Sequence, residues 1–280
     1  MFHNVLDKTQ SAWYSTRMNT DKQLDKYDNL MIRLFKNSNL RHSQRFFQYM
    51  KRIWGWLWRG VAICFAMLLI YQLWIFAHVC WWIKFNPSTT AFMDTRLSIM
   101  QESRPDAALQ HQWVPYGKIS NNLKRALIAS EDAKFVDHEG FDWDGIQKAY
   151  EKNMKKGKIV AGGSTISQQL AKNLFLSGSR SPFRKIEEAA ITVMMEAVMD
   201  KERILEIYLN VIEWGDGVFG AEAAARHYYR ISAAQLSAAQ SAKLAAMVPN
   251  PRYYDKHREA AGLQKKTGII LSRMNSSDIP

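Results

Sequence analysis

The sequence predicts a mainly α-helical protein in which one membrane-spanning helix precedes a helical body. Residues 60–83 form a run of 24 residues without lysine, arginine, aspartate or glutamate. Beyond residue 115, apolar residues recur at spacings of three and four, as they do on one face of an α-helix. The alternating pattern of strands is scarce there, so we expect few strands.

The uncharged run is long enough to cross a bilayer, because roughly 20 apolar helical residues span its hydrocarbon core. Trp54, Trp56 and Trp58 precede it and Trp81 and Trp82 lie near its end, as aromatic belts do at membrane interfaces. A signal peptide is disfavoured, because the run begins late, is too long and lacks a small-residue cleavage site. The alternative is a buried helix of a soluble protein, which seldom needs so long an uncharged run.

The charge of the chain is uneven. The 280 residues carry a formal net charge of +12, and residues 1–59 hold eleven lysines and arginines against four aspartates. By the positive-inside rule, this arm is predicted to be cytoplasmic and the body to lie outside. We interpret the arm as a solvated tail near anionic headgroups. Nucleic-acid binding is disfavoured, because the chain contains no recognisable nucleic-acid module.

These features divide the chain into four predicted parts. They are a basic cytoplasmic arm at 1–59, a span at 60–83, a membrane-proximal connector at 84–115 and a catalytic body at 116–280. Both cysteines, Cys64 and Cys80, lie in the span. The body is therefore predicted to contain no disulfide and no thiolate metal site.

Glycine and proline separate the predicted helices of the body. Leu123, Leu127 and Ile128 form an apolar face on a helix that ends near Glu131. Ser164 is the expected N-cap of a later helix. Residues 177–183 are expected to form a loop and residues 215–217 a turn. The further helices are expected at residues 144–155, 164–176, 184–199, 201–211, 220–229 and 233–247.

The Gly162-Gly163-Ser164-Thr165 turn leads into a helix, and a helix N-terminus suits phosphate because its N–H groups are free. Thr165, Gln169, Lys172 and Asn173 share one face of that helix. The Gly-Lys-Ser/Thr ending of a Walker A loop is missing. An ordinary capped helix with a polar solvent face is the alternative interpretation.

Arg184 and Lys185 lie four and three residues before Glu188, so both cations flank the carboxylate on one helical face. One interpretation is a pair of surface ion pairs, worth about 0.3–0.5 kcal/mol each. The other is a diphosphate clamp, whose carboxylate orients the phosphates or holds a divalent ion.

Glu131 stands at the end of an apolar helix face, and we expect the ring of Phe135 to cover it. Partial burial prepares a carboxylate for proton transfer. The alternative is a glutamate that caps the helix or forms an ion pair. Asp132 is expected to accept backbone N–H groups, and His138 is either a base or a hydrogen-bonded structural histidine. The histidines of the body lack the paired spacing of a metal site.

Five blocks, in order, carry a resemblance to a known family. They are Glu131-Asp132-x-x-Phe135-x-x-His138-x-Gly140, Gly162-Gly163-Ser164-Thr165-x-x-Gln168-Gln169-x-x-Lys172-Asn173, Arg184-Lys185-x-x-Glu188, Lys201-x-x-Ile204-Leu205-Glu206-x-Tyr208-Leu209-Asn210 and Gly220-Ala221-x-Ala223-Ala224-Ala225-x-x-Tyr228-Tyr229. Over roughly residues 115–275, the chain resembles the peptidoglycan glycosyltransferases of family 51, and most closely their monofunctional members.

The resemblance implies an enzyme that polymerises lipid II into β-1,4-linked glycan strands with inversion, on the outer face of the cytoplasmic membrane. Undecaprenyl pyrophosphate would be the leaving group. The implied fold is a lysozyme-like helical head with a small membrane-facing jaw. The implied partners are lipid II, the growing strand and the cytoplasmic membrane, with no organic cofactor.

The motif match also implies roles for individual residues. Glu131 would deprotonate the 4-hydroxyl of the acceptor, and Glu188 would assist the diphosphate directly or through Mg²⁺ or Mn²⁺. The cations Lys172, Arg184 and Lys185 would stabilise charge on the leaving group. The remaining residues would line the donor groove or shape the site: Ser164, Thr165, Gln169, Asn173, Asp132, Phe135 and His138.

Few positions depart from the family pattern. Ser167 stands where a threonine is usual, and Lys265-Lys266 lies where relatives carry arginine, which leaves the role of that cation open. No Ser-x-x-Lys nucleophile motif follows, so crosslinking is expected from a separate transpeptidase, with cell-wall or division proteins as further partners. Two alternatives are a lysozyme-like glycan-cleaving enzyme, which would leave the cations unused, and an inactive scaffold, which predicts decay at the glutamates.

Overall fold

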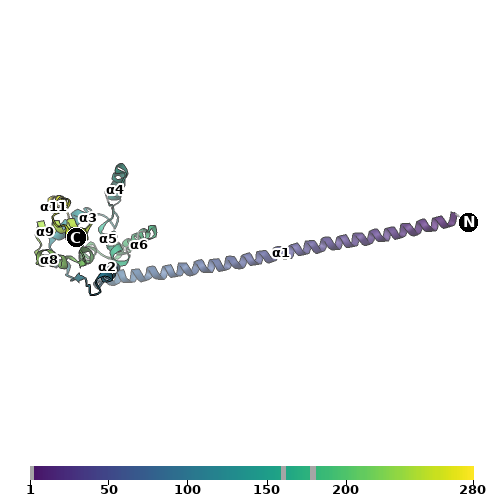
Figure 1. Ribbon diagram of the computed structural model, residues 1–280, viewed down its shortest axis with the longest axis horizontal. Coiled ribbons are helices and arrows are strands. Elements are labelled where there is room, and N and C mark those ends of the chain that lie inside the picture. The colour runs from purple at the N-terminus through teal and green to yellow at the C-terminus, as the bar shows by residue number, and fades with distance from the viewer. Residues whose placement is uncertain (1–2, 159–161, 177–180) are drawn as a thin grey trace. The chain divides into compact units, whose positions relative to one another are not determined.

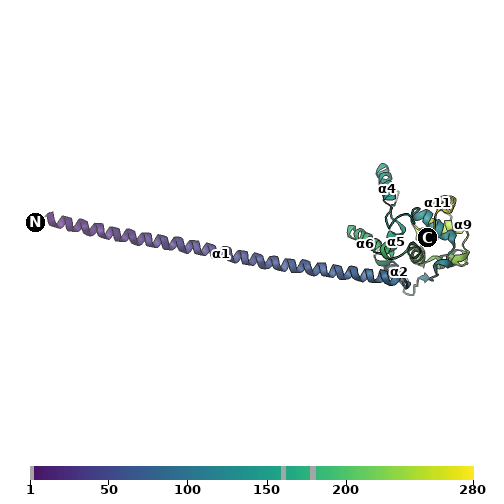
Figure 2. The same ribbon diagram turned by 180° about the vertical axis from the view of Figure 1, so that it is seen from behind.

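The structure is a computed structural model that describes residues 3–158, 162–176 and 181–280. The chain divides into two units, Met1–Tyr71 and Gln72–Pro280. In the first unit, helix α1 (His3–Trp82) runs without a break, and its last residues continue into the second unit (Figures 1 and 2).

Helix α1 contains the segment Phe46–Trp82, which is long and apolar enough to cross a membrane. It is the one such segment among the residues that the structure describes. Most of its large apolar side chains are exposed, with Trp56 70% and Ile70 67% exposed. A core helix of a soluble protein would bury these side chains, whereas a lipid-facing helix exposes them. The predicted span at 60–83 lies within this segment except for its last residue, Ile83.

The last turns of α1 belong to the body. Ile75 and Val79 are fully buried members of its hydrophobic core. The ring of Trp82 lies 5.1 Å from that of Phe175, and Arg203 donates to the carbonyl of Trp82. The folded body therefore begins within α1, before residue 83, where the predicted span ends.

The body is mainly helical, as predicted, with three short strands in its described part. The sheet order is β1-β3-β2, with β1 parallel and β2 antiparallel to β3. The elements are α2 (Ala91–Ser103), β1 (Gln110–His111), η1 (Tyr116–Lys118), α3 (Asn121–Glu131), α4 (Trp143–Lys156), α5 (Ile166–Phe175), α6 (Pro182–Val198), α7 (Lys201–Val211), β2 (Glu213–Gly215), β3 (Val218–Phe219), α8 (Ala221–Tyr229), η2 (Ala233–Gln235), α9 (Ala238–Met247), α10 (Pro251–Lys256), α11 (Ala261–Arg273) and η3 (Met274–Ser276).

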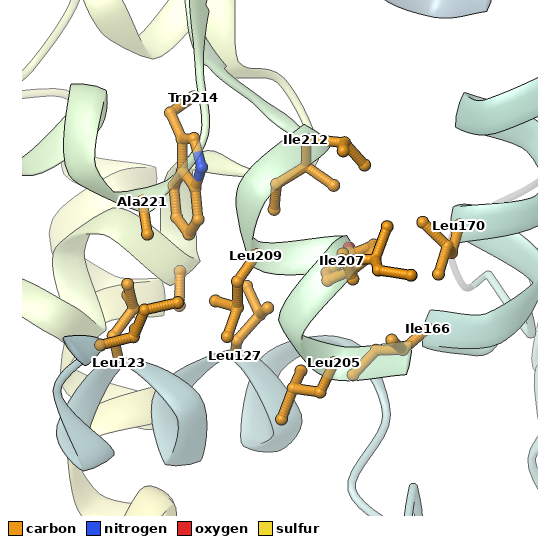
Figure 3. Packing of buried hydrophobic residues seen from close by; sticks show 14 of the residues in the cluster. Leu123, Leu127, Ile166, Leu170, Leu205, Ile207, Leu209, Ile212, Trp214 and Ala221 are labelled. Atoms are coloured by element: carbon orange, nitrogen blue, oxygen red, sulfur yellow. The ribbon is translucent and has the colours of Figure 1, made fainter. Parts of the chain in front are cut away.

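Helix α7 is the central helix of the core. Every residue from Ile204 to Val211 except Glu206 is buried, so α7 is covered on all sides. Figure 3 shows its leucines and isoleucines between Leu127 of α3 and Leu170 of α5. Helices α3 and α5, which carry two of the motif blocks, are thus fixed against one rigid element.

Two predicted helix bounds were wrong, for the same physical reason. Thr165, not Ser164, caps α5, because its hydroxyl and the side chain of Gln168 form a reciprocal capping box. The single helix expected at 233–247 is interrupted, because Ser237 and Gln240 form a capping box that starts α9. In both cases a serine or threonine followed by glutamine three residues later decides where a helix begins.

The segments between the predicted helices also differ from expectation. Helix α6 begins at Pro182 with Ser181 as its N-cap, earlier than the expected Arg184. Of the loop expected at 177–183, residues 177–180 lie outside the described residues. The segment 84–115 contains helix α2 and strand β1, and α2 packs on α5.

Candidate active site

A pocket of about 180 Å³ lies between the end of α3 and the turn before α5. Glu131, Asp132 and Asp142 line it together with residues 162–165. The first two motif blocks therefore meet at one cavity. Gly163 allows this close approach, because a Cβ there would lie 3.0 Å from the Cα of Ile146.

Glu131 is the last residue of α3, and donors reach both of its carboxylate oxygens. The hydroxyl of Ser130 donates to Oε1 at 2.9 Å, and Nε2 of Gln169 donates to Oε2 at 3.2 Å. The ammonium of Lys266 lies 3.6 Å from Oε1. The Glu131 side chain is 12% exposed. These donors hold the carboxylate in place while it borders the pocket.

Lys266 was the cation whose role the sequence left open. It comes from α11, far along the chain from Glu131, and α11 packs against both α3 and α9. No local spacing could reveal this ion pair, because it depends on the packing of the C-terminal helix. Lys266 is therefore a site residue that sequence reasoning did not assign.

Phe135 was expected to cover Glu131 from one helical turn further on, but the helix does not reach it. Helix α3 ends at Glu131 and Asp132 is its C-cap, so helical spacing does not extend to Phe135. The fully buried Phe135 ring lies 4.7 Å from the ammonium of Lys201 and 6.4 Å from the ring of His138. Phe135 is thus a buried residue that supports the site from within the core.

Asp132 joins two parts of the site. Its Oδ1 lies 2.9 Å from Nε2 of His138, and its Oδ2 accepts the backbone N–H of Ile166 at 3.0 Å. Ile166 is the first residue of α5, so Asp132 ties that helix N-terminus to the end of α3. These contacts favour the structural interpretation of Asp132 and His138 over a role as bases.

The turn before α5 brings two hydroxyl side chains to the pocket, and they differ in whether they are already hydrogen-bonded. The hydroxyl of Thr165 donates to the carbonyl of Gly140 at 2.7 Å and accepts from Gln168, so it is already engaged. Gly140 has φ +86°, and a Cβ there would lie 2.8 Å from Thr192, so glycine is required. Ser164 is exposed and lines the pocket. Ser164, rather than Thr165, therefore has a side chain free to meet a ligand.

Lys172 of α5 connects the two glutamates electrostatically. Burial lowers the pKa of Lys172, and the negative charges of Glu188 and Glu131 act in the opposite direction. Arg184 and Lys185 of α6 lower that pKa further. The second and third motif blocks therefore form one charge cluster, which also involves Glu131.

Glu188 is the buried anion of this cluster. It is 4% exposed, and its Oε1 pairs with the ammonium of Lys185. The Lys185 side chain is half exposed, so its positive charge remains accessible from solvent. On α5, Gln169 is half-buried and Asn173 is buried. The cluster thus contains one buried carboxylate, that of Glu188, and three cations, Lys172, Arg184 and Lys185.

Comparison with known proteins shows the family of the chain. A sequence profile of the transglycosylase family, described as "Transglycosylase", matches residues 98–275. The chain belongs to the transglycosylase family. This confirms the resemblance drawn from the five motif blocks, and it makes glycosyl transfer the chemistry to be explained by the pocket and the charge cluster.

Individual relatives of this transglycosylase are highly similar. It is 68% identical over 223 residues to the biosynthetic peptidoglycan transglycosylase of Methylobacillus flagellatus, covering 80% of this chain and 97% of that protein. It is also 68% identical over 225 residues to the protein of the same name from Laribacter hongkongensis, covering 80% and 99%. The relative from Thiobacillus denitrificans is 59% identical over 231 residues, covering 82% and 100%.

We expect Asp132→Ala to destabilise this transglycosylase. The N–H of Ile166 and the ring of His138 would lose a buried acceptor, which costs about 2 kcal/mol of the free energy of unfolding. Urea unfolding in detergent, followed by tryptophan fluorescence, measures the change. Asp137→Ala is the matched control, because Asp137 is an exposed aspartate in the same motif. Equal unfolding midpoints for the two variants would contradict the structural role of Asp132.

Proposed function

We propose that this transglycosylase polymerises lipid II into β-1,4-linked peptidoglycan glycan strands and releases undecaprenyl pyrophosphate. The observation that carries the proposal is the arrangement of Glu131 at a pocket beside a cluster of three cations built around Glu188. A single carboxylate suits deprotonation of an acceptor hydroxyl, and a cation cluster suits a diphosphate leaving group. The names of the relatives point to the same substrate class.

In the proposed reaction, the 4-hydroxyl of the acceptor sugar transfers its proton to the Glu131 carboxylate. The hydroxyl oxygen attacks C1 of the donor from the face opposite the diphosphate, so the configuration inverts. The C1–O bond to the diphosphate breaks and its electron pair stays on the phosphate oxygen. A sugar hydroxyl is a weak nucleophile at neutral pH, and general-base assistance contributes about 10²–10⁴-fold.

The cations act on the leaving group. Negative charge develops on the diphosphate as the bond breaks, and preorganised cations stabilise it without reorganising. Lys172, Arg184 and Lys185 are held at this place by α5 and α6, which pack together. A hydrolase that cleaves finished glycan has no phosphate to stabilise and would not use this cluster.

A divalent ion is a separate part of the proposal. Among the described residues, no group of three histidine, cysteine, aspartate or glutamate side chains could hold a metal ion. Mg²⁺ commonly binds through one or two carboxylates together with substrate phosphates. Glu188 with the donor diphosphate fits that pattern, and Mg²⁺ or Mn²⁺ bound there would supply further positive charge. The proton transfer to Glu131 and the departure of the diphosphate, as proposed, use only side chains of the protein.

We further propose that the N-terminus is cytoplasmic, that the body lies outside the membrane, and that α4 and α6 form a jaw that faces the bilayer. Both helices expose large apolar side chains, with Phe183 81% exposed. Single exposed apolar residues are ordinary, but a group of them indicates an interaction surface. On these two helices the exposed large apolar side chains are those of Trp143, Tyr150, Met154, Phe183, Ile186 and Val193.

The function is tested with the full-length protein in liposomes that contain purified lipid II. We expect glycan strands on a gel, and no release of fragments from isolated cell wall. Fragments without strands would indicate the lysozyme-like alternative, and neither product would indicate the scaffold. A parallel reaction with a chelator tests the divalent ion. Adding a purified transpeptidase to the strands tests the proposed crosslinking partner.

The membrane anchor gives a prediction of its own. Deleting residues 1–71 should lower the rate on lipid II in liposomes, because enzyme and substrate would no longer share a surface, and change the rate in detergent much less. This boundary keeps Ile75 and Val79, whose loss would open the core of the body. Equal rates on liposomes with and without residues 1–71 would contradict this coupling.

A further inference from the structure

Tyr208 of α7 reaches the carboxylate of Glu131 through one intermediate side chain. Its hydroxyl donates to Oε1 of Gln169 at 2.8 Å, and Nε2 of Gln169 donates to Oε2 of Glu131 at 3.2 Å. The three residues come from α7, α5 and α3. Tyr208 has no role in the proposed reaction.

The chemistry of the three groups determines how the amide of Gln169 is turned. A carboxylate accepts hydrogen bonds, so Gln169 must present its NH₂ group to Glu131. Its carbonyl oxygen then faces Tyr208, whose hydroxyl must donate. Burial raises the pKa of Tyr208 well above its ordinary value, and the charges of Glu131 and Asp132 raise it further. Tyr208 therefore keeps the proton that it donates.

Tyr208 is also the most rigidly held of the three. It is fully buried on the central helix α7, where its neighbours Ile207 and Leu209 are fully buried too. Gln169 is half-buried on the edge of the site. A half-buried glutamine has several rotamers open to it, and the hydrogen bond to a fixed partner selects one of them.

We propose that Tyr208 is a positioning residue that fixes the amide of Gln169, and through it the Oε2 atom of Glu131. This inference rests on the proposed function, in which Glu131 is the base. Two charged side chains from other helices also act at Glu131, that of Lys266 of α11, next to Oε1, and that of Lys172 of α5. Neither lysine acts on Oε2 through Gln169, so the effect of Tyr208 on the Glu131 carboxylate is separate from theirs.

Tyr208→Phe removes the hydroxyl and keeps the ring. We expect kcat on lipid II to fall about tenfold, equivalent to loss of one neutral hydrogen bond, with KM within about twofold of the parent. The acidic limb of the pH profile of kcat/KM should move to higher pH. The amide N–H of Gln169 favours the charged form of the Glu131 carboxylate, and the variant no longer fixes that amide.

Tyr116→Phe is the matched control. Tyr116 is a half-buried tyrosine that, like Tyr208, donates its hydroxyl to one acceptor, here the carbonyl of Pro280, away from the pocket. It should lose stability as Tyr208→Phe does, with kcat and the acidic limb unchanged. Loss of kcat without any movement of the acidic limb would indicate a merely structural Tyr208 and overturn the inference.

A double-mutant cycle with Gln169→Leu completes the test, since coupled residues give non-additive effects. We expect Tyr208→Phe to have little further effect on kcat once Gln169 is leucine, and additive losses would overturn the inference. The two proposals fail differently. An inactive wild-type protein would contradict the function, whereas an active wild type with an unaltered Tyr208→Phe variant would contradict only the role of Tyr208.

Discussion

Glu131→Gln should abolish strand synthesis from lipid II, with kcat reduced about 10²–10⁴-fold because the general base is lost. Glutamine keeps the size of the side chain, and its carbonyl oxygen can still accept from the hydroxyl of Ser130. Its amide cannot take a proton from the acceptor hydroxyl. Initial rates on purified lipid II at saturating concentration measure the effect.

The variant should remain folded. Glu131 borders the pocket at the end of α3, so the substitution leaves the hydrophobic core unchanged. We expect the melting temperature to change by about 4 °C at most, corresponding to roughly 1 kcal/mol. Glu139→Gln is the control, because Glu139 is an exposed glutamate in the same motif. Appreciable strand synthesis by Glu131→Gln would remove Glu131 as the base.

The helices were predictable because their signals are local. The bounds of α7 agree with the prediction at both ends, since Asp200 caps its start and its apolar residues recur with helical spacing. Errors arose where two cap signals lay close together, as at Ser164 and Thr165. Sequence spacing alone does not show which of two adjacent hydroxyls faces the free N–H groups.

The charge cluster was only partly predictable. The proximity of Arg184, Lys185 and Glu188 follows from helical spacing within α6. Their approach to Lys172 depends on the packing of α5 against α6, which local patterns do not encode. The contacts of Lys266 and Tyr208 with the Glu131 region likewise join distant helices. Sequence reasoning therefore placed Tyr208 in a motif block and left the role of the cation at Lys265-Lys266 open, but it could not show that Tyr208 and Lys266 lie beside the Glu131 region.

Glu188→Gln should reduce kcat/KM about 10²-fold, because it removes the anion that organises the cations at the leaving group. Loss of one oriented electrostatic group in an active site costs about 10²–10³-fold. With the negative charge gone, Lys172, Arg184 and Lys185 repel one another, and Lys172 loses the interaction that favours its charged form. Rates at subsaturating lipid II measure kcat/KM directly.

Glu187→Gln is the matched control, since it makes the same substitution at the neighbouring position of α6, which has no role in the proposed mechanism. We expect it to retain nearly full activity. If Glu188→Gln is as active as Glu187→Gln, the proposed diphosphate clamp is wrong.

Lys185→Ala separates the two ways in which Glu188 could act. If Glu188 works by holding Lys185, then Lys185→Ala should reproduce much of the loss, and added Mg²⁺ or Mn²⁺ should not restore either variant. If Glu188 instead binds the ion together with the diphosphate, Glu188→Gln alone should require higher metal concentrations, because Lys185→Ala leaves the carboxylate in place. A metal titration of both variants therefore distinguishes a direct electrostatic role of Glu188 from metal binding.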